Sequence, residues 1–385
     1  MKSISKIQNT GFMKNISIRL VTMAVVLFSA LAAVAQDPTF SQYDPNQLYY
    51  NPAYAGYKKL ARFGATYRNL WPNVPGKTMP GPLGSYSVFG DGYFNIKDRF
   101  TGGGGLFMMQ DVEGIGYLTT TTAGIIYSQH MPRIKGRNDR YDRWNIYLGF
   151  KAYMGNIHVD WSRYVFSDQL NATYGVANPT SFNQDGIVSR FYFDFDFGLV
   201  VRNNFMGKGK WFNEFGFAMA HVLAPSISIT GSPSDAARLP RKYVATYRSN
   251  IAVLRDNFFI GPTILFENQG RFFAVNGGVD FFVRFKNRKT EVIPISVGVY
   301  NRFSFILKDV QNNKNKINTS ALILSVTHRG NFATGQYAAG YYVGFSVDFP
   351  YMGLAMQTAG AYELTAGVTI PYRKRDVLFC PFEAY

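Results

Sequence analysis

Histidine, cysteine and serine side chains carry most protein catalysis and metal binding, and their spacing in this sequence predicts neither. The four histidines are far apart, and none has a carboxylate or a cysteine at metal-ligand spacing. No G-x-S-x-G motif places a nucleophilic serine. His221 and Asp196 could face a common lumen, but no serine is set beside them by a motif. We therefore expect a protein that is not an enzyme, with no catalytic residue, no metal and no cofactor. The histidines are His130, His158, His221 and His328.

Two other chemistry-bearing features also favour structural roles. The glycine run Gly102 to Gly105 opens a predicted strand and lacks the following helix and lysine of a phosphate loop, so it predicts close backbone packing or a kink in a sheet. Cys380, the single cysteine, cannot form an internal disulfide. We interpret it as a packed tail residue, with an intermolecular bridge or a lipid attachment as the alternatives.

Residues 1–35 are predicted to be a cleaved signal peptide. Lys14 and Arg19 flank an apolar run from Leu20 to Leu31, which is too short for a comfortable transmembrane helix of about 20 residues. Ala33-Val34-Ala35 fits a cleavage site before Gln36. The leader has four basic residues and no acid, so its removal lowers the net charge of +16 by four. The basic mature chain favours acidic partners or anionic outer-membrane lipids, and no motif indicates nucleic acid.

The body of the chain shows a period of two, which indicates β-strands. From Phe191 to Val201, apolar residues alternate with Tyr192, Asp194 and Asp196, so one face is apolar and the other polar. The stretches Trp144 to Met154 and Arg271 to Phe285 repeat this pattern. Such strands are longer than the five or six residues usual in soluble sheets. A soluble β-sandwich is the alternative, but these lengths suit a tilted strand that crosses a bilayer.

Fourteen such segments predict an all-β fold, a transmembrane antiparallel β-barrel of the outer-membrane type. Closure is required because an open edge in hydrocarbon would leave backbone groups unpaired. We expect residues 61–372 to form the barrel and residues 373–385 a periplasmic tail, with the mature N- and C-termini both periplasmic. The expected strands are 61–70, 83–94, 101–112, 116–130, 143–155, 189–203, 210–223, 241–255, 257–268, 270–286, 291–307, 316–329, 338–350 and 360–372.

The connections then alternate between the two sides of the membrane. The predicted external loops are Leu70 to Pro82, Asn156 to Val188, Ala224 to Pro240, Lys308 to Asn315 and Pro350 to Ala359. The predicted periplasmic turns include Pro132 to Asp142, Asn203 to Gly209 and Lys286 to Thr290. The first of these turns is basic, with Arg133, Lys135 and Arg137. Its charges are interpreted as simple solvation, with a contact to periplasmic machinery as the alternative.

Residues 36–60 are predicted to be a periplasmic or plug segment ahead of the first strand. The stretch ends in Asn51-Pro52-Ala53-Tyr54-Ala55-Gly56, a turn-prone motif, and is too rich in aromatic residues for an exposed linker. We expect Tyr43, Tyr49, Tyr50 and Tyr54 to pack into the lumen and seal the barrel floor. Contact with a secretion apparatus is the alternative. The sequence leaves open whether the barrel is plugged or holds a water channel.

The same stretch resembles the mature N-terminus of the PorP/SprF family of outer-membrane proteins, which are linked to type IX secretion and gliding motility in Bacteroidota. The matching residues are Gln36-Asp37-Pro38, Phe40-Ser41-Gln42-Tyr43 and Leu48-Tyr49-Tyr50-Asn51-Pro52-Ala53-Tyr54-Ala55-Gly56. Ser167-Asp168-Gln169 and Cys380-Pro381 are similar to further family features. The family's Cys-Pro-Arg-Phe ending is altered here, since Phe382 follows Pro381 directly.

The resemblance implies a non-catalytic barrel that assists the export or surface anchoring of a cognate large surface protein. Such a partner is a gliding adhesin-like chain with a type B C-terminal sorting domain, and type IX translocon components are further partners. We expect the partner to dock on the external loops, where Trp71, Trp161, Arg163 and Tyr164 are the best contact candidates. A diffusion channel or substrate-specific porin and a structural part of the gliding apparatus are the alternatives.

Overall fold

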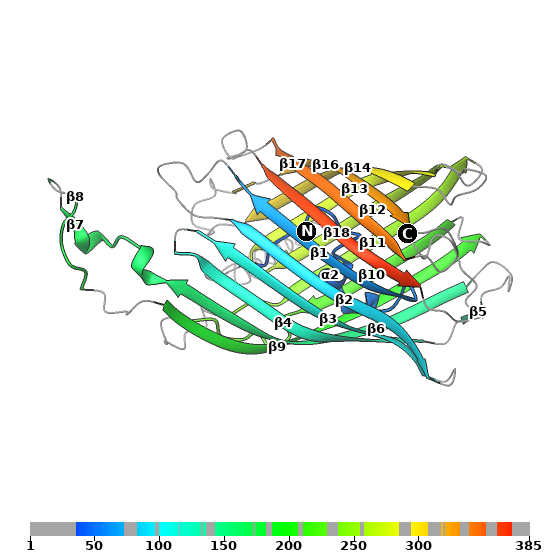
Figure 1. Cartoon of the computed structure of the whole chain (residues 1–385), viewed down its shortest axis with the longest axis horizontal. Coiled ribbons are helices and arrows are strands. Elements are labelled where there is room, and N and C mark those ends of the chain that lie inside the picture. Colours follow the sequence, from blue (N-terminus) through cyan, green and yellow to red (C-terminus); the bar gives the residue numbers. More distant parts are fainter. Residues whose placement is uncertain are drawn as a thin grey trace, which may run out of the picture.

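Fourteen long antiparallel strands form the wall of a closed barrel (Figure 1). The computed structural model describes residues 36–371 apart from 73–82, 97–99, 115, 132–133, 136–142, 172, 174, 182–186, 207–210, 229–237, 255–257, 285–293, 307–316, 319, 332–338 and 352–359. The long strands are β1 (Leu60–Leu70), β2 (Gly84–Ile96), β3 (Phe100–Glu113), β4 (Leu118–His130), β6 (Arg143–Asp160), β9 (Ile187–Met206), β10 (Trp211–Ala220), β11 (Lys242–Leu254), β12 (Phe258–Gln269), β13 (Phe272–Arg284), β14 (Pro294–Ile306), β16 (Ala321–Asn331), β17 (Gly340–Pro350) and β18 (Ala361–Pro371).

Each long strand pairs with the next one along the chain, and the first pairs with the last. The β1–β18 seam runs in register from Leu60↔Pro371 to Leu70↔Ala361. The predicted all-β barrel of fourteen strands is therefore confirmed. Two short strands pair with strands of the wall: β5 (Ile134–Lys135) pairs with β6, and β15 (Ile317–Asn318) pairs with β14. Among the described residues, no helix is long and apolar enough to cross a membrane.

Side chains alternate between the two faces of the wall as the period of two requires. Phe191 and Phe193 are 65 % and 68 % exposed on the outside, whereas Asp194, the residue after Phe193, is fully buried on the inside. Glu214 and Glu363 are buried on the same inner face. The outer face is thus apolar, which suits lipid, and the inner face is polar.

The two ends of the barrel differ. The long-loop end, where β1 ends at Leu70 and β6 at Asp160, has the arm, which we define as Trp161–Ser181. The arm contains η2 (Trp161–Arg163), η3 (Ser167–Gln169) and the hairpin of β7 (Leu170–Asn171) with β8 (Gly175–Val176), and it projects beyond the barrel at the left of Figure 1. The opposite, short-turn end is where β1 begins at Leu60 and β18 ends at Pro371.

Several predicted boundaries were wrong. The predicted loop from Asn156 to Val188 is shorter, because β6 continues to Asp160 and pairs there with Ile187 of β9. Residues 156–160 of β6 stay paired with residues 187–191 of β9, although their polar composition suggested a loop. The strand expected from residue 316 begins at Ala321 instead, since Ile317–Asn318 form the separate strand β15.

The main core lies inside the barrel and not between layers. A short helix, α2 (Gln47–Tyr50), and a single turn, η1 (Pro52–Tyr54), occupy the lumen. Phe40, Leu48 and Tyr54 are at most 1 % exposed and pack against inward wall residues such as Val200 and Leu265.

Candidate functional site

Residues 36–60 pass through the whole lumen, and we call Gln36–Tyr57 the lumen segment. Near the long-loop end, the Asp37 N–H donates to Gln269 Oε1 at 2.8 Å, at the last residue of β12. Toward the short-turn end, the Gly56 N–H donates to Asp91 Oδ2 at 2.7 Å, and β1 then begins at Leu60. Gln36 and Pro371 therefore lie at opposite ends of the barrel, whereas we expected both mature termini on one side. The reason is that polar partners for the segment extend along the full height of the wall.

The aromatic residues of the lumen segment pack against one another. Tyr43, Tyr50 and Tyr54 are at most 6 % exposed, and the rings of Tyr49 and Tyr50 meet edge to face at 4.9 Å. The Tyr43 hydroxyl donates to the Tyr54 hydroxyl, which donates to Glu214 Oε1 at 2.9 Å. The tyrosines thus fill the lumen with apolar rings while their hydroxyls still find buried partners.

The Asn51–Gly56 motif is held by the backbone of the wall. Asn51 caps η1 by accepting from the Ala53 N–H at 2.9 Å, and its amide donates to the carbonyls of Leu199 and Phe217 at 3.1 and 3.2 Å. Gly56 has a φ of +65°, which favours glycine. The motif therefore makes a turn that a side-chain amide fastens to β9 and β10.

The wall beneath this motif is made of glycines, which we call the glycine floor: Gly103, Gly149 and Gly198. A Cβ at Gly103 would lie 1.9 Å from the Ala55 carbonyl oxygen, and one at Gly149 would lie 2.1 Å from the Ala53 nitrogen. A Cβ at Gly198 would lie 2.0 Å from Asn51 Oδ1. The glycine floor lets the segment's backbone touch the wall. Close backbone packing was one of the two expectations for the Gly102–Gly105 run, and Gly103 makes such a contact.

A second contact, the seam cluster, joins the segment to the strands that close the barrel. It consists of Ser41 and Gln42 from the segment with Arg68, Arg302, Asp348 and Glu363 from the wall. The Ser41 and Gln42 N–H groups donate to the two oxygens of Glu363 at 2.6 and 3.0 Å. Asp348 accepts from Arg68 at 2.8 Å and from Arg302 at 3.0 Å. Two arginines thus meet two carboxylates, which balances the buried charge.

A third contact fixes the segment near the long-loop end. His221, which follows β10 with a φ of +57°, bonds to Asp37 Oδ2 at 2.8 Å and to Asp194 Oδ2 at 3.0 Å. Burial alone would lower the pKa of His221, but the Asp37 charge and the hydrogen bonds that the ring donates to Asp194 and Asp37 raise it to about 10. Burial alone would raise the pKa of Asp37, but the charge of His221 and its hydrogen bond hold it well below its usual range. The imidazolium therefore forms a buried ion pair at neutral pH.

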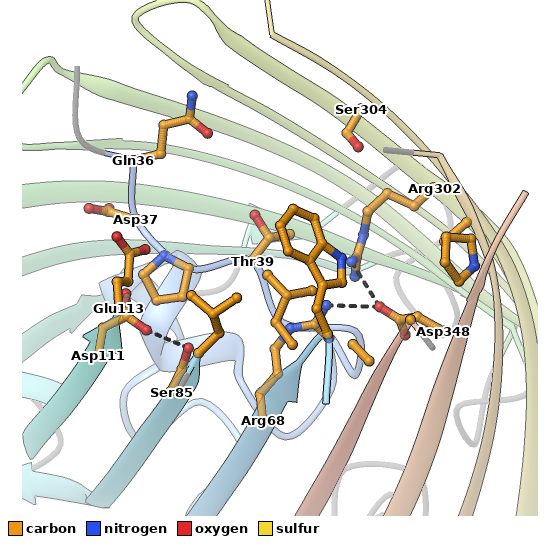
Figure 2. Close-up of a pocket in the computed structure, with 18 of the residues that line it drawn as sticks. Gln36, Asp37, Thr39, Arg68, Ser85, Asp111, Glu113, Arg302, Ser304 and Asp348 are labelled. Carbon is orange, nitrogen blue, oxygen red and sulfur yellow. Dashed lines mark hydrogen bonds and ion pairs between the residues drawn. The ribbon is translucent and has the colours of Figure 1, made fainter. Parts of the chain in front are cut away.

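A cavity of about 220 Å³ remains beside the start of the segment at this end of the barrel. Figure 2 shows Asp111 and Glu113 on one side, and Arg68, Arg302 and Asp348 on the other. Within the described part of the chain, no three His, Cys, Asp or Glu side chains are placed to hold a metal ion. In chemical terms the site holds a peptide segment through ion pairs and backbone contacts.

The remaining residues expected to bind partners lie elsewhere. Trp71 lines the cavity, and its backbone N–H donates to the Gly360 carbonyl. Trp161, Arg163 and Tyr164 come together in the arm, where Arg163 bonds to Asp160 at 2.8 Å and lies over the Tyr117 ring at 4.1 Å. Lys135 is in β5, whereas Arg133, Arg137, Cys380 and the leader 1–35 fall outside the described residues.

Sequence reasoning predicted close packing at Gly103 but missed Gly149, Gly198 and the seam cluster. Gly103, Gly149 and Gly198 occupy inward positions of β3, β6 and β9. Small residues at inward positions of period-two strands were the available signal. Nothing in the sequence pairs them with a motif about 50 to 150 residues away.

The model of the family described as "Type IX secretion system membrane protein PorP/SprF" matches residues 32–368. No curated protein matches the chain significantly. Among solved structures, a Pseudomonas aeruginosa FadL homologue is 11 % identical, with 86 % of this chain and 94 % of that chain covered and a TM-score of 0.44. A TodX deltaS2S3 mutant monoaromatic hydrocarbon channel is 8 % identical, with 90 % and 98 % covered and a TM-score of 0.42.

Proposed function

The chain belongs to the PorP/SprF family of type IX secretion system membrane proteins, and we propose that it assists the export or surface anchoring of one cognate secreted protein. The partner we infer is a large gliding adhesin-like chain with a type B C-terminal sorting domain. Family and fold favour such an outer-membrane secretion barrel over an enzyme. The leader 1–35 would direct the chain to the outer membrane, with the tail 373–385 in the periplasm.

The filled lumen is the observation that carries this proposal. Residues from the segment's start to its end have partners on the wall, from Asp37 with His221 to Gly56 with Asp91. A barrel that only passed small solutes would need a continuous water path between its mouths. A lumen occupied by buried tyrosines and ion pairs instead supports a rigid platform on which another chain docks.

The arm is the first docking surface that we propose. Val165, Leu170 and Val176 are each more than half exposed. The rings of Trp161 and Tyr164 lie nearby at a tilt of 45°, with their centroids 5.5 Å apart. Aromatic and arginine residues with exposed apolar neighbours are typical of binding hot spots. The cavity edge at Trp71 is a second candidate contact for the same partner.

The short-turn end is where we propose contact with translocon components. There the basic residues Arg133, Lys135 and Arg137 would face the periplasm, and they suit acidic protein surfaces or anionic lipid headgroups. Charge reversal at all three that left recovery of translocon components unchanged would remove this part of the proposal.

The test replaces the arm, residues 161–181, by a short Gly-Ser linker in the native strain. We expect the barrel to reach the membrane at normal levels while surface display of the cognate secreted protein falls. The matched control is the single change Asp168→Asn, which loosens the arm's own contacts to Thr180 and Ser181 without removing the arm. Normal display and normal gliding after loss of the whole barrel would refute the proposal.

A substrate-specific porin is the second candidate, favoured by the cavity at the long-loop end. Conductance of the purified barrel in a planar bilayer separates the two functions. Steady conductance by the intact chain would support the porin. Conductance only after removal of residues 36–57 would support a plugged docking platform.

A further inference from the structure

Near the long-loop end of the barrel, β9 pairs with a strand on one side only. β9 pairs with β6 along its length up to Ile187, but β10 ends at Ala220, and the last β9–β10 partners are Phe197 and Met219. Residues 187–195 of β9 therefore have no neighbouring strand on the β10 side within the described part of the chain. No other long strand described here has a one-sided stretch of this length.

The chain after β10 turns inward instead of continuing along β9. His221 and Ala224 have φ values of +57° and +46°, and the His221 N–H donates to Asp196 Oδ1 at 3.2 Å. Further on, the Ser228 carbonyl accepts from Arg190 Nη1 at 2.9 Å. Arg190 is one of the residues of β9 whose side chains face the lumen. The chain from His221 to Ser228 therefore lies on the lumen side of β9 and not along its edge.

The hydrogen-bonding direction of the open edge follows from its last bonded residue. The Phe195 carbonyl accepts from the Val222 N–H at 3.1 Å, so Phe195 directs its backbone groups toward the β10 side. Residues two apart in a strand direct these groups to the same side. Phe193, Phe191 and Ser189 therefore offer three N–H and three C=O groups at this edge.

We propose that this edge of β9 is a strand-addition site for an extended segment of the secreted partner. A chain segment of roughly five to seven residues would bond to Ser189, Phe191 and Phe193, as in known cases of β-strand addition. Its alternate side chains would be apolar, because Phe191 and Phe193 are exposed on the outer face beside it. The partner's identity rests on the proposed function, whereas the edge itself is a property of the wall.

A second copy of the barrel does not fit this edge. Two copies in one membrane have the same orientation, so both β9 strands descend in the same direction and cannot run antiparallel. If a two-fold axis along the membrane normal related the copies, the two β9 strands would cross each other at about twice the strand tilt of roughly 40°. Neither arrangement allows a regular ladder, and a different chain is required.

The experiment compares amide hydrogen exchange in the purified full-length barrel with that in the complex recovered with its secreted partner from native outer membrane. We expect the amides of Ser189, Phe191 and Phe193 to exchange fast in the barrel alone and at least about tenfold more slowly in the complex. Arg190, Tyr192 and Asp194 bond to β6 on the other side and serve as internal controls that are slow in both.

A pair of variants at one position separates the edge from its side chain. Phe191→Pro removes an N–H that faces the open side and leaves the β6 ladder intact, which is where proline is tolerated in a sheet. Phe191→Ala removes the same ring but keeps the N–H. We expect Phe191→Pro to recover roughly fivefold to tenfold less partner than Phe191→Ala. If Phe191→Pro fails to assemble, the exchange measurement decides alone.

The outcomes distinguish this inference from the proposed function. A recovered complex in which the three amides stay fast would overturn strand addition and leave the docking function standing. Slow exchange of these amides already in the barrel alone would show that the chain's own residues cover the edge, which also overturns it. Failure to recover any secreted partner would reject both.

Discussion

The two halves of the lumen segment are held by different physics. The Asn51–Gly56 half touches the glycine floor, where a Cβ at any of the three glycines would lie within 2.1 Å of an atom of the segment. The Asp37–Gln42 half is held by ion pairs and charge-assisted hydrogen bonds to His221, Asp348 and Glu363. The first contact depends on shape and the second on charge. The first half also has ionisable partners, because Tyr54 donates to Glu214 and the Gly56 N–H donates to Asp91. The four predictions below test which kind of contact dominates in each half.

The largest effect is expected at the glycine floor. Gly103→Val would place a branched side chain within 1.9 Å of the Ala55 carbonyl, and neither backbone can yield. We expect loss of the folded barrel or expulsion of the segment, measured as membrane level and heat-modifiable mobility. Gly104→Val is the matched control, because a Cβ at Gly104 meets nothing closer than 3.9 Å. Equal behaviour of the two variants would contradict the steric half of the comparison.

The next effect is expected in the seam cluster. Asp348→Asn leaves Arg68 and Arg302 buried without their shared counter-charge. Breaking a buried ion pair by removing one partner costs about 3–5 kcal/mol, so we expect a loss of that size in the free energy of unfolding. Denaturant unfolding of the refolded barrel measures it. The exposed arm residue Asp168 provides the contrast, since Asp168→Asn should change the free energy of unfolding far less than Asp348→Asn does. If Asp348→Asn lowered the free energy of unfolding as little as Asp168→Asn does, the ion pairs would not be what holds this half of the segment.

A smaller effect is expected for the turn itself. Asn51→Ala removes the cap on Ala53 and the two bonds to the Leu199 and Phe217 carbonyls, while the glycine floor stays in contact. We expect a loss of about 1–2 kcal/mol. Asn51→Asp is the control, since its oxygen can still cap Ala53 but cannot donate to the carbonyls. If Asn51→Ala alone prevented assembly, shape would not be the main determinant of this half.

The smallest effect is local and depends on pH. The pKa of His221 is raised to about 10, so its contribution is fully present below its ordinary pKa of 6.5 and is lost as pH rises through about 10. A spin label at Gln36 should be immobile at neutral pH and become mobile above pH 10. With Asp37→Asn, the label should be mobile at neutral pH as well. A mobility midpoint near pH 6.5 would contradict the buried ion pair.

The sequence predicted the wall well, because a period of two is a local signal that each strand shows by itself. It identified the inward Asp194 and the outward Phe193 from alternation alone. It failed where contacts join distant residues, as between Gly103 and Ala55 or Ser41 and Asp348, since nothing local pairs them. The overhang of β9 past β10 was missed for a similar reason. It accompanies the inward turn at His221, whose partner Asp37 lies 184 residues earlier in the chain.

The position of the seam cluster has a consequence for the order of assembly. Ser41 and Gln42 come before β1, but their partners Asp348 and Glu363 are in β17 and β18, the two strands that come after all the others of the wall and are synthesised after them. The lumen segment cannot take its final place until those strands exist. Arg68, on β1, reaches the same carboxylates across the β1–β18 junction. We therefore expect ring closure and filling of the interior to depend on each other, and a chain that lacks β18 to leave residues 36–57 accessible to proteases.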